Sequence, residues 1–222
     1  MSASRRLYHY WRSTSSWRVR WGFEAKGLHP ELVAVDLLSG ENDSPEHLRR
    51  NPMGYVPVLE LCGQDTPSGG FTRYLGESTA ILEWLEETHP SPALLPKDPL
   101  AKARVRMLCE IINAGTQPLG NLSVTEYLSD EYCNGDKETR KTWSQHWIRK
   151  GLSAYETLVQ ETAGRFSFGD DLTLADIYLI PQCYAAIRND MALSEFPTIE
   201  RIHRVALELP SCQASHPDRF KP

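Results

Sequence analysis

The chain has 222 residues and a formal net charge of −5, with 41% hydrophobic and 24% charged residues. This composition is typical of a soluble globular protein with one large or two small domains. The acidic balance argues against general nucleic-acid binding, and the chain has no apolar run of membrane-spanning length and no signal-peptide core. We therefore expect no nucleic-acid partner and no membrane partner.

The cysteines indicate a reducing compartment. There are five, an odd number, scattered along the chain without metal-ligand spacing: Cys62, Cys109, Cys133, Cys183 and Cys212. This pattern favours free thiols in the cytoplasm and argues against a metal site.

The first stretch of interest joins a predicted strand to a predicted helix. Residues Leu7–Trp11 alternate as a strand does, and Trp17–Lys26 form a helical segment that stops at Gly27. The hydroxyl-rich run Ser13–Ser16 lies between them, beside the positive end of the helix dipole. Such a place stabilises an anion, either a phosphate, a carboxylate or a thiolate; the alternative is a simple N-cap.

Arginines are concentrated at the start of the chain. All of them up to Arg20 precede the first acidic residue, Glu24. A mitochondrial presequence has this bias, but here the arginines run directly into the first predicted strand. We interpret them as local positive potential around the anion site or as a solvated face.

The next elements complete a small α/β unit. A strand at Leu32–Leu37 implies a right-handed parallel crossover, and a short helix is predicted at Pro45–Arg50. Pro57 heads the strand that ends at Leu61, and it frees the backbone before it from the sheet. The long loop Cys62–Gly70 leads to a returning strand at Phe71–Leu75.

A third helix is predicted to open at Glu77, with Ser78 as its cap. A linker follows at residues 89–96, which contains three prolines. Beyond it the apolar period is helical, with Leu100, Met107 and Ile112 on one predicted stripe. Further helices are predicted at Trp143–Thr162, at Thr173–Ile187 and after Pro197.

A capping box at Thr173–Asp176 is predicted to open the second of these helices. The predicted order is β-α-β-α-β-β-α in residues 1–89, followed by an all-helical domain in residues 97–222.

Several stretches along nearly the whole chain resemble the cytosolic glutathione transferases, in particular their zeta class, the maleylacetoacetate isomerases. The matching stretches are Tyr10–Ser13, Ser16–Arg20, Asn51–Met53, Val56-Pro57, Leu94–Pro96, Gln117–Leu119, Asn121–Val124, Asp176, Pro181-Gln182 and Ser215–Pro217. The resemblance implies a thioredoxin-like first domain, a helical second domain and a homodimer.

The resemblance also implies a glutathione-dependent cis–trans isomerase of phenylalanine and tyrosine breakdown. In that family the glutathione thiolate adds to the cis double bond of a diacid, the new single bond rotates, and elimination gives the trans product. Glutathione is regenerated, so it acts as a cofactor.

The implied site residues fit this chemistry. Ser13 would donate to the thiolate, together with Thr14 and Ser15, and the Val56 backbone would pair with the cysteinyl part of glutathione. Glu77 and Ser78 would hold its γ-glutamyl end. Arg188 would hold a substrate carboxylate, the alternative being a solvated helix-end cation near Asp190. The other implied cofactor-binding residues are Ser16, Trp17, Arg18, Asn42, Gln117, Asn121, Leu122 and Ser123.

Two departures from the family pattern stand out. Ser15 replaces the usual cysteine of a Ser-Ser-Cys run, and a serine cannot form a mixed disulfide with glutathione. The Cys62–Gly70 loop is longer than in typical relatives. Three interpretations are open: it shifts the nearby γ-glutamyl site, it contacts a neighbouring subunit, or it is a tolerated surface insertion.

Other functions stay open at this point. Maleylpyruvate isomerase is the same chemistry on a shorter diacid. Glutathione conjugation or dehalogenation of small α-halo acids would consume glutathione or release halide. A non-catalytic binding module would have little reason to keep Ser13, Glu77 and Arg188 together.

Overall fold

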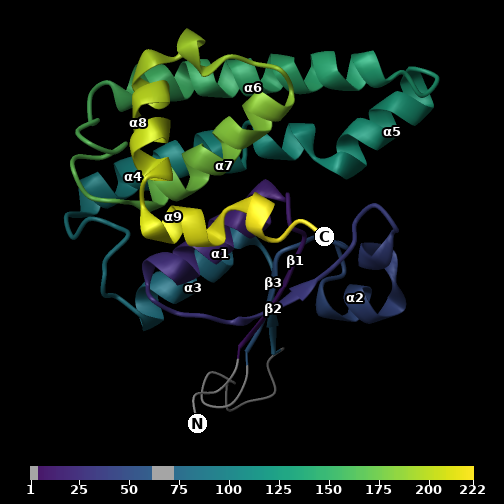
Figure 1. Ribbon diagram of the computed structural model, residues 1–222, viewed down its shortest axis with the longest axis horizontal. Coiled ribbons are helices and arrows are strands. Elements are labelled where there is room, and N and C mark those ends of the chain that lie inside the picture. Colours follow the sequence, from purple (N-terminus) through teal and green to yellow (C-terminus); the bar gives the residue numbers. More distant parts are fainter. Residues whose placement is uncertain (1–4, 62–72) are drawn as a thin grey trace. The chain divides into compact units, whose positions relative to one another are not determined.

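The computed structural model describes residues 5–61 and 73–222. The chain forms two compact units, residues 1–92 together with 210–222, and residues 93–209 (Figure 1). The predicted fold class, an α/β part followed by helices, is confirmed. The predicted boundaries differ from this division at the C-terminus, because residues 210–222 pack within the first unit. The Cys62–Gly70 loop lies outside the described residues.

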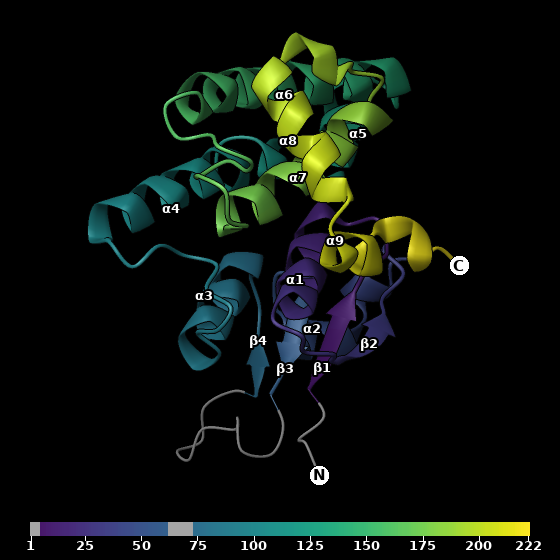
Figure 2. The ribbon, with the colours of Figure 1, turned by 60° about the vertical axis from the view of Figure 1, so that its left-hand side comes forward.

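The first unit is built on a four-stranded sheet with the order β2-β1-β3-β4. Its strands are β1 (Arg6–His9), β2 (Glu31–Ala34), β3 (Val58–Glu60) and β4 (Tyr74–Leu75). Strands β1 and β2 are parallel, as the sequence predicts for a crossover, and β3 is antiparallel to both β1 and β4. Figure 2 shows the strands side by side in this order.

Helices and short 3-10 turns complete the first unit. They are α1 (Thr14–Ala25), η1 (Glu41–Asp43), α2 (Pro45–Arg50), α3 (Ser78–Thr88), α9 (Pro210–Ser215) and η5 (Pro217–Arg219). Helix α1 packs against both α3 and α9. A Cβ on Gly22 would lie 2.3 Å from Leu82 Cδ2, so a larger residue here would force the Leu82 side chain to move.

The two faces of the sheet follow the alternation of β1. Tyr8 and Tyr10 pack with Val35, Val56 and Val58 in one apolar cluster. Because side chains alternate along a strand, the intervening His9 points to the opposite face, where Arg20 of α1 contacts it.

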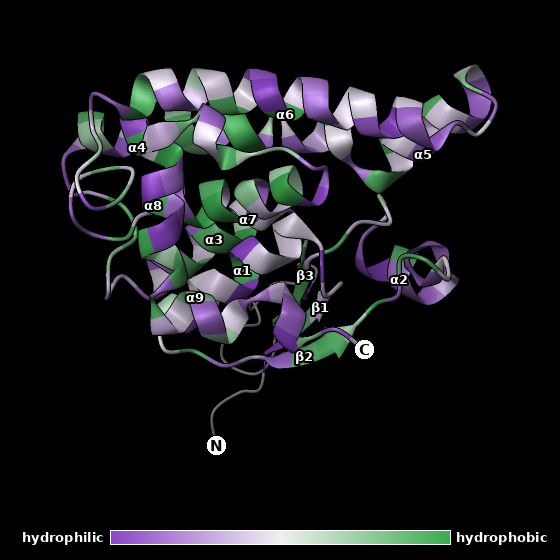
Figure 3. Cartoon of the chain, turned by 45° about the horizontal axis from the view of Figure 1, so that its top comes forward, coloured by the Kyte–Doolittle hydropathy of each residue, from purple (hydrophilic) through white to green (hydrophobic). Residues whose placement is uncertain are grey.

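The second unit is all helical. Its elements are α4 (Pro99–Asn113), η3 (Gln117–Gly120), α5 (Leu122–Tyr132), α6 (Lys137–Val159), α7 (Leu174–Arg188), η4 (Leu193–Glu195) and α8 (Pro197–Leu207). Helix α7 contacts α4, α6 and α8 and is buried over most of its length. Figure 3 shows its largely hydrophobic colouring. A helix that is apolar on most sides belongs at the centre of a bundle.

Some predictions in this unit need correction. Leu100 and Met107 are exposed, whereas Ile112 of the predicted stripe is buried, together with Val105, Leu108 and Cys109. Helix α6 begins at Lys137 rather than Trp143 because Asp136 caps it. The short helices α5 and α9 were not predicted. No helix in the described ranges is both long and apolar enough to cross a membrane.

The predicted capping box is confirmed. Asp176 Oδ2 accepts the Thr173 N–H at 2.9 Å and the Thr173 hydroxyl at 3.1 Å, while Oδ1 accepts the Ser167 N–H at 2.7 Å. Burial raises the pKa of Asp176, and the hydrogen bonds oppose that rise. The buried carboxyl therefore joins the start of α7 to the segment before it.

A second acidic side chain caps α8 from a different helix. Glu156 of α6 accepts the N–H groups of Thr198 at 3.0 Å and Ile199 at 2.9 Å in the first turn of α8. Burial alone would raise the pKa of Glu156, but these hydrogen bonds outweigh it and the pKa is lowered. The ionised carboxylate thus fixes α8 on α6.

Replacing this carboxylate should destabilise the protein at neutral pH. We expect Glu156→Gln to lower the free energy of unfolding by about 1–3 kcal/mol at pH 7, the cost of weakening buried hydrogen bonds to a charged group. Because the folded pKa lies below the unfolded one, the wild-type advantage is present above pH ~4.5 and is lost as the pH falls through the folded pKa.

Denaturant unfolding across this pH range measures the difference, with the exposed Glu161→Gln as the matched control. A difference between wild type and Glu156→Gln that does not change with pH would contradict the assignment.

Candidate active site

The first turn of α1 contains the residues for which the sequence predicts an anion site. Ser13 is the N-cap, and its Oγ accepts the Ser16 N–H at 3.2 Å. The Ser13 N–H is bonded back to the Tyr10 carbonyl at 3.2 Å. Within the described part of the chain, the N–H groups of Thr14 and Ser15 have no acceptor. Two donors and the helix dipole therefore remain for an anion.

The next three residues lie behind this turn rather than at its surface. Ser16 is fully buried, and its Oγ accepts the Tyr10 N–H at 3.4 Å. Trp17 is also fully buried, and its Nε1–H donates to Ser215 Oγ at 3.0 Å. These contacts support a role in holding the turn, and direct cofactor contact by Ser16 or Trp17 stays a prediction.

Arg18 and Arg20 correct one interpretation of the early arginines. Both are buried, with exposures of 0% and 2%, so they are not part of a solvated face. Arg18 Nη1 donates to Ser78 Oγ at 3.4 Å. Helix α1 and the Glu77-Ser78 segment are therefore joined through one buried guanidinium.

The start of α3 differs from the prediction. Glu77, not Ser78, occupies the N-cap position, and it has no side-chain cap hydrogen bond. Ser78 is the first residue of the helix, and its hydroxyl is engaged by Arg18. Glu77 is exposed and has a φ of 61°, which a residue with a side chain adopts only when its surroundings enforce it. Such strain is typical of functional sites.

The Val56-Pro57 segment offers an open length of backbone. The Val56-Pro57 peptide bond is cis. Over residues 5–61 and 73–222, the structure gives neither the Val56 N–H nor its carbonyl a hydrogen-bond partner. Val56 also packs in the same apolar cluster as Tyr10, close to the loop that leads to Ser13. A peptide ligand could pair with this edge as a strand does.

Two residues of the preceding helix and turn hold this segment, and sequence reasoning missed them as functional residues. His47 Nε2–H and Asn51 Nδ2–H both donate to the Tyr55 carbonyl, each at 3.1 Å. Asn51 Oδ1 in turn accepts the Met53 N–H at 3.1 Å. The Asn51-Pro52 turn was the available signal, since asparagine side chains organise turns in this way.

Asn42 lies in η1, where its Nδ2–H donates to Asp43 Oδ1 at 3.1 Å. No contact in the described ranges joins its side chain to Ser13, Val56 or Glu77. Its role in cofactor binding stays a prediction.

The predicted site residues of the second unit lie at helix ends. Gln117 opens η3, and Asn121 is the N-cap of α5, where Oδ1 accepts the Leu122 N–H at 2.7 Å. Leu122 is half-buried and Ser123 is exposed. The Asn121 side chain thus has a structural role in this unit, and cofactor contact by Gln117, Asn121, Leu122 and Ser123 stays a prediction.

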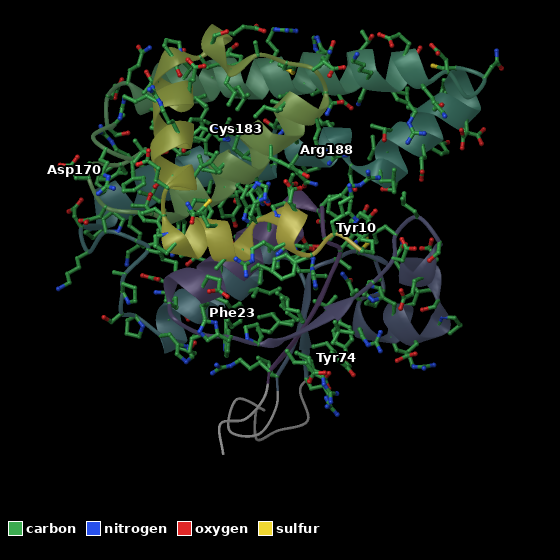
Figure 4. All side chains as sticks on the ribbon, in the orientation of Figure 1. Tyr10, Phe23, Tyr74, Asp170, Cys183 and Arg188 are labelled. Atoms are coloured by element: carbon green, nitrogen blue, oxygen red, sulfur yellow. The ribbon has the colours of Figure 1, made fainter. Side chains whose placement is uncertain are left out.

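Arg188 is the last residue of α7 and is exposed (Figure 4). Its guanidinium lies 5.6 Å from the Tyr184 ring centroid, a cation–π distance. The carboxylate of Asp190, its partner in the alternative interpretation, forms an ion pair with Lys141 Nζ at 2.7 Å. The Arg188 guanidinium therefore lies against an aromatic ring of its own helix, and its role in holding a substrate carboxylate stays a prediction.

Comparison with known proteins accounts for this set of features. Models of the glutathione S-transferase N-terminal and C-terminal domains match residues 7–93 and 123–214. The maleylacetoacetate isomerase of Rattus norvegicus is 41% identical over 215 residues, which cover 96% of this chain and 92% of the relative.

Two solved structures extend the comparison. Maleylacetoacetate isomerase from Anaeromyxobacter dehalogenans 2CP-1, crystallised with glutathione in its active site, has a TM-score of 0.86 at 48% identity, covering 100% of this chain and 98% of that one. A bacterial maleyl pyruvate isomerase of the zeta class has a TM-score of 0.87 at 36% identity, covering 96% of each chain. The chain therefore belongs to the glutathione S-transferase family and, within it, to the zeta class that includes the maleylacetoacetate isomerases.

Proposed function

We propose that this protein is a glutathione-dependent cis–trans isomerase that converts maleylacetoacetate to fumarylacetoacetate, in the breakdown of phenylalanine and tyrosine. The observation that carries the proposal is the first turn of α1, where Ser13 and two unbonded N–H groups face outward from the helix start. A site of this kind favours a thiolate over a thiol.

The described residues of the first unit fit glutathione. Its cysteinyl peptide groups need a donor and an acceptor, and the Val56 backbone supplies both. The free α-amino group of its γ-glutamyl end needs an acceptor, and the exposed Glu77 carboxylate is one. When bound, glutathione supplies the sulfur nucleophile that adds to the cis double bond and is regenerated.

The residues of this chain divide the remaining work between them. Ser13 Oγ accepts a backbone N–H, so its own hydrogen is left to donate to the sulfur. Thr14 and Ser15 add helix-end donors, and Ser15 at this position gives a hydroxyl in place of the family thiol. Arg188 holds a carboxylate of the diacid, and Gln117 and Ser123 supply polar contacts.

We also propose a cytoplasmic homodimer. The family resemblance supports the dimer. Free thiols support a reducing compartment, since Cys109, Cys133, Cys183 and Cys212 are all unbridged among the described residues. Burial raises the pKa of Cys212 to about 12, so that thiol is unreactive.

Two other reactions are alternatives that the activity test below distinguishes from this one. The similarity to a maleyl pyruvate isomerase favours a shorter diacid as the second candidate substrate. Conjugation or dehalogenation of α-halo acids is the third.

The first test follows the isomerisation of maleylacetone, an analogue of maleylacetoacetate, by absorbance with glutathione present in catalytic amount. We expect many turnovers per glutathione, with the thiol concentration unchanged at the end, because the cofactor is regenerated. Comparison of kcat/KM with maleylpyruvate ranks the two diacids. Glutathione loss with dichloroacetate or an aryl halide, without isomerisation, would assign the protein to the transferase reactions instead.

Ser13→Ala should reduce kcat by about 10- to 100-fold, since a hydrogen bond to a charged group contributes about 1.5–3 kcal/mol. The variant also loses an N-cap worth about 1 kcal/mol of stability. Asp98→Ala removes the matched cap of α4, where Oδ1 accepts the Ala101 N–H at 2.8 Å, and should lower stability alone. Wild-type turnover in Ser13→Ala would remove this hydroxyl from the mechanism.

Arg188→Ala should raise KM for the diacid by about tenfold or more, because a charge-assisted pair with the substrate is lost. The Kd of glutathione, measured by titration calorimetry, should stay unchanged. Arg149→Ala removes an exposed arginine of α6 and is the control. Equal weakening of substrate and glutathione would point to a disturbed fold rather than a carboxylate clamp.

A further inference from the structure

A second buried guanidinium, that of Arg20, has no place in the chemistry above. Arg20 lies in the middle of α1 and is 2% exposed. Burying a permanent positive charge is costly unless several acceptors surround it. The identity of those acceptors therefore indicates what the residue is for.

Three of the acceptors lie in the segment that leads to the active-site turn. Arg20 Nη1 donates to His9 Nδ1 at 3.0 Å and to the Tyr10 carbonyl at 3.4 Å, and Nη2 donates to the Trp11 carbonyl at 2.9 Å. Burial and the neighbouring Arg20 charge lower the pKa of His9 to about 3, so its ring stays neutral and accepts the bond.

This segment connects directly to Ser13. The Tyr10 carbonyl that receives Arg20 also receives the Ser13 N–H at 3.2 Å, and the Tyr10 N–H donates to Ser16 Oγ at 3.4 Å. The backbone between Tyr10 and Ser16 is therefore held at both ends, and Arg20 fixes its first carbonyls. A displacement of these carbonyls would move the Ser13 hydroxyl.

The fourth acceptor lies at the other end of the chain. Arg20 Nε donates to the Ser215 carbonyl at 3.2 Å, and the Phe220 ring centroid lies 4.8 Å from the guanidinium carbon. The same ring meets His9 edge-on, with centroids 5.7 Å apart. Residues 210–220 belong to the first unit, where α9 packs against α1 (Figure 2).

We propose that Arg20 is a positioning residue for the cofactor thiolate, and that the C-terminal residues Ser215 and Phe220 hold its guanidinium in place. The inference rests on the proposed function. Arg20 acts through the Tyr10 and Trp11 carbonyls, which set where Ser13 and the open N–H groups of α1 point. The C-terminal segment is then part of the active-site support, although it lies more than 200 residues from Ser13 in sequence.

The test compares Arg20→Lys, Arg20→Met and Phe220→Leu with wild type and with Arg219→Met. Lysine keeps the charge but not the planar fork that reaches four acceptors, whereas methionine removes both. Phe220→Leu keeps the guanidinium and loses only its aromatic cover. Arg219 is exposed in the same segment and serves as the matched control.

Two readouts separate positioning from folding. The first is the pKa of the bound glutathione thiol, from the ultraviolet absorbance of the thiolate against pH. The second is the Kd of glutathione from titration calorimetry. We expect Arg20→Lys to raise the thiol pKa by about one unit, with a roughly tenfold loss of kcat at neutral pH that recovers as the pH rises. The Kd should change by less than about threefold, since the Val56 and Glu77 contacts remain.

The variants should follow an order. Arg20→Met should raise the thiol pKa more than Arg20→Lys, and Phe220→Leu should raise it less, while Arg219→Met leaves it at the wild-type value. Phe220→Leu keeps the test available if a substitution at Arg20 prevents folding, as judged by circular dichroism.

The contrary outcomes are distinct. A wild-type thiol pKa in folded Arg20→Lys and Phe220→Leu, with only a lower melting temperature, would overturn the positioning role and leave the proposed function intact. Absence of glutathione binding by the wild-type protein would overturn the proposed function, and this inference with it.

Discussion

The burial of two guanidinium groups on one helix is the constraint on which the first unit depends. Arg18 and Arg20 lie two residues apart on α1, and both side chains are almost completely buried. Each needs acceptors, because burying an unpaired charge is costly. The acceptors come from separate parts of the chain: Ser78 at the start of α3 for Arg18, and the end of β1, the following loop and Ser215 for Arg20.

This arrangement explains why α1 is buried almost all round. Trp17 and Trp21 stack on one another with ring centroids 6.4 Å apart, and their indole N–H groups donate to Ser215 and Ser211 of α9. A helix enclosed in this way has little freedom to rotate or slide. Its N-terminus is consequently a rigid place to present Ser13, which the proposed recognition of a thiolate over a thiol would require.

The backbone at Val56 is held in a different way from the start of α1. At Tyr55 the carbonyl is satisfied twice, by His47 and Asn51, whereas one residue later the backbone groups have no partner in the described ranges. The two hydrogen bonds to the Tyr55 carbonyl fix the position of the neighbouring Val56 backbone, and they leave the Val56 N–H and carbonyl available to a ligand. The two segments are thus held by different means. At α1 buried charges hold a helix end, and at Val56 polar side chains hold a loop.

The features that could be predicted from the sequence are those whose interacting residues lie close together along the chain. The Gly27 stop and the Thr173–Asp176 box involve residues within a few positions of each other, and both predictions were confirmed; the N-cap that the sequence offered as the alternative within Ser13–Ser16 is Ser13. Ser78 was wrongly predicted as a cap because its hydroxyl is taken by Arg18, sixty residues earlier. Leu100 and Met107 fit the apolar period of α4 equally well, but the period alone does not say which side of a helix faces the bundle.

The arginines show the same limit most clearly. An arginine-rich start to the chain predicts positive potential or a solvated face, and for Arg18 and Arg20 the solvated face was wrong. Charged residues are expected at the surface unless buried acceptors surround them. Here those acceptors are mainly backbone carbonyls. Every residue has a carbonyl, so the sequence does not indicate which of them will lie beside an arginine. A tryptophan on either side of the pair, Trp17 and Trp21, was the one local indication that this stretch is enclosed. Side chains that large are placed at a surface less often than beneath one.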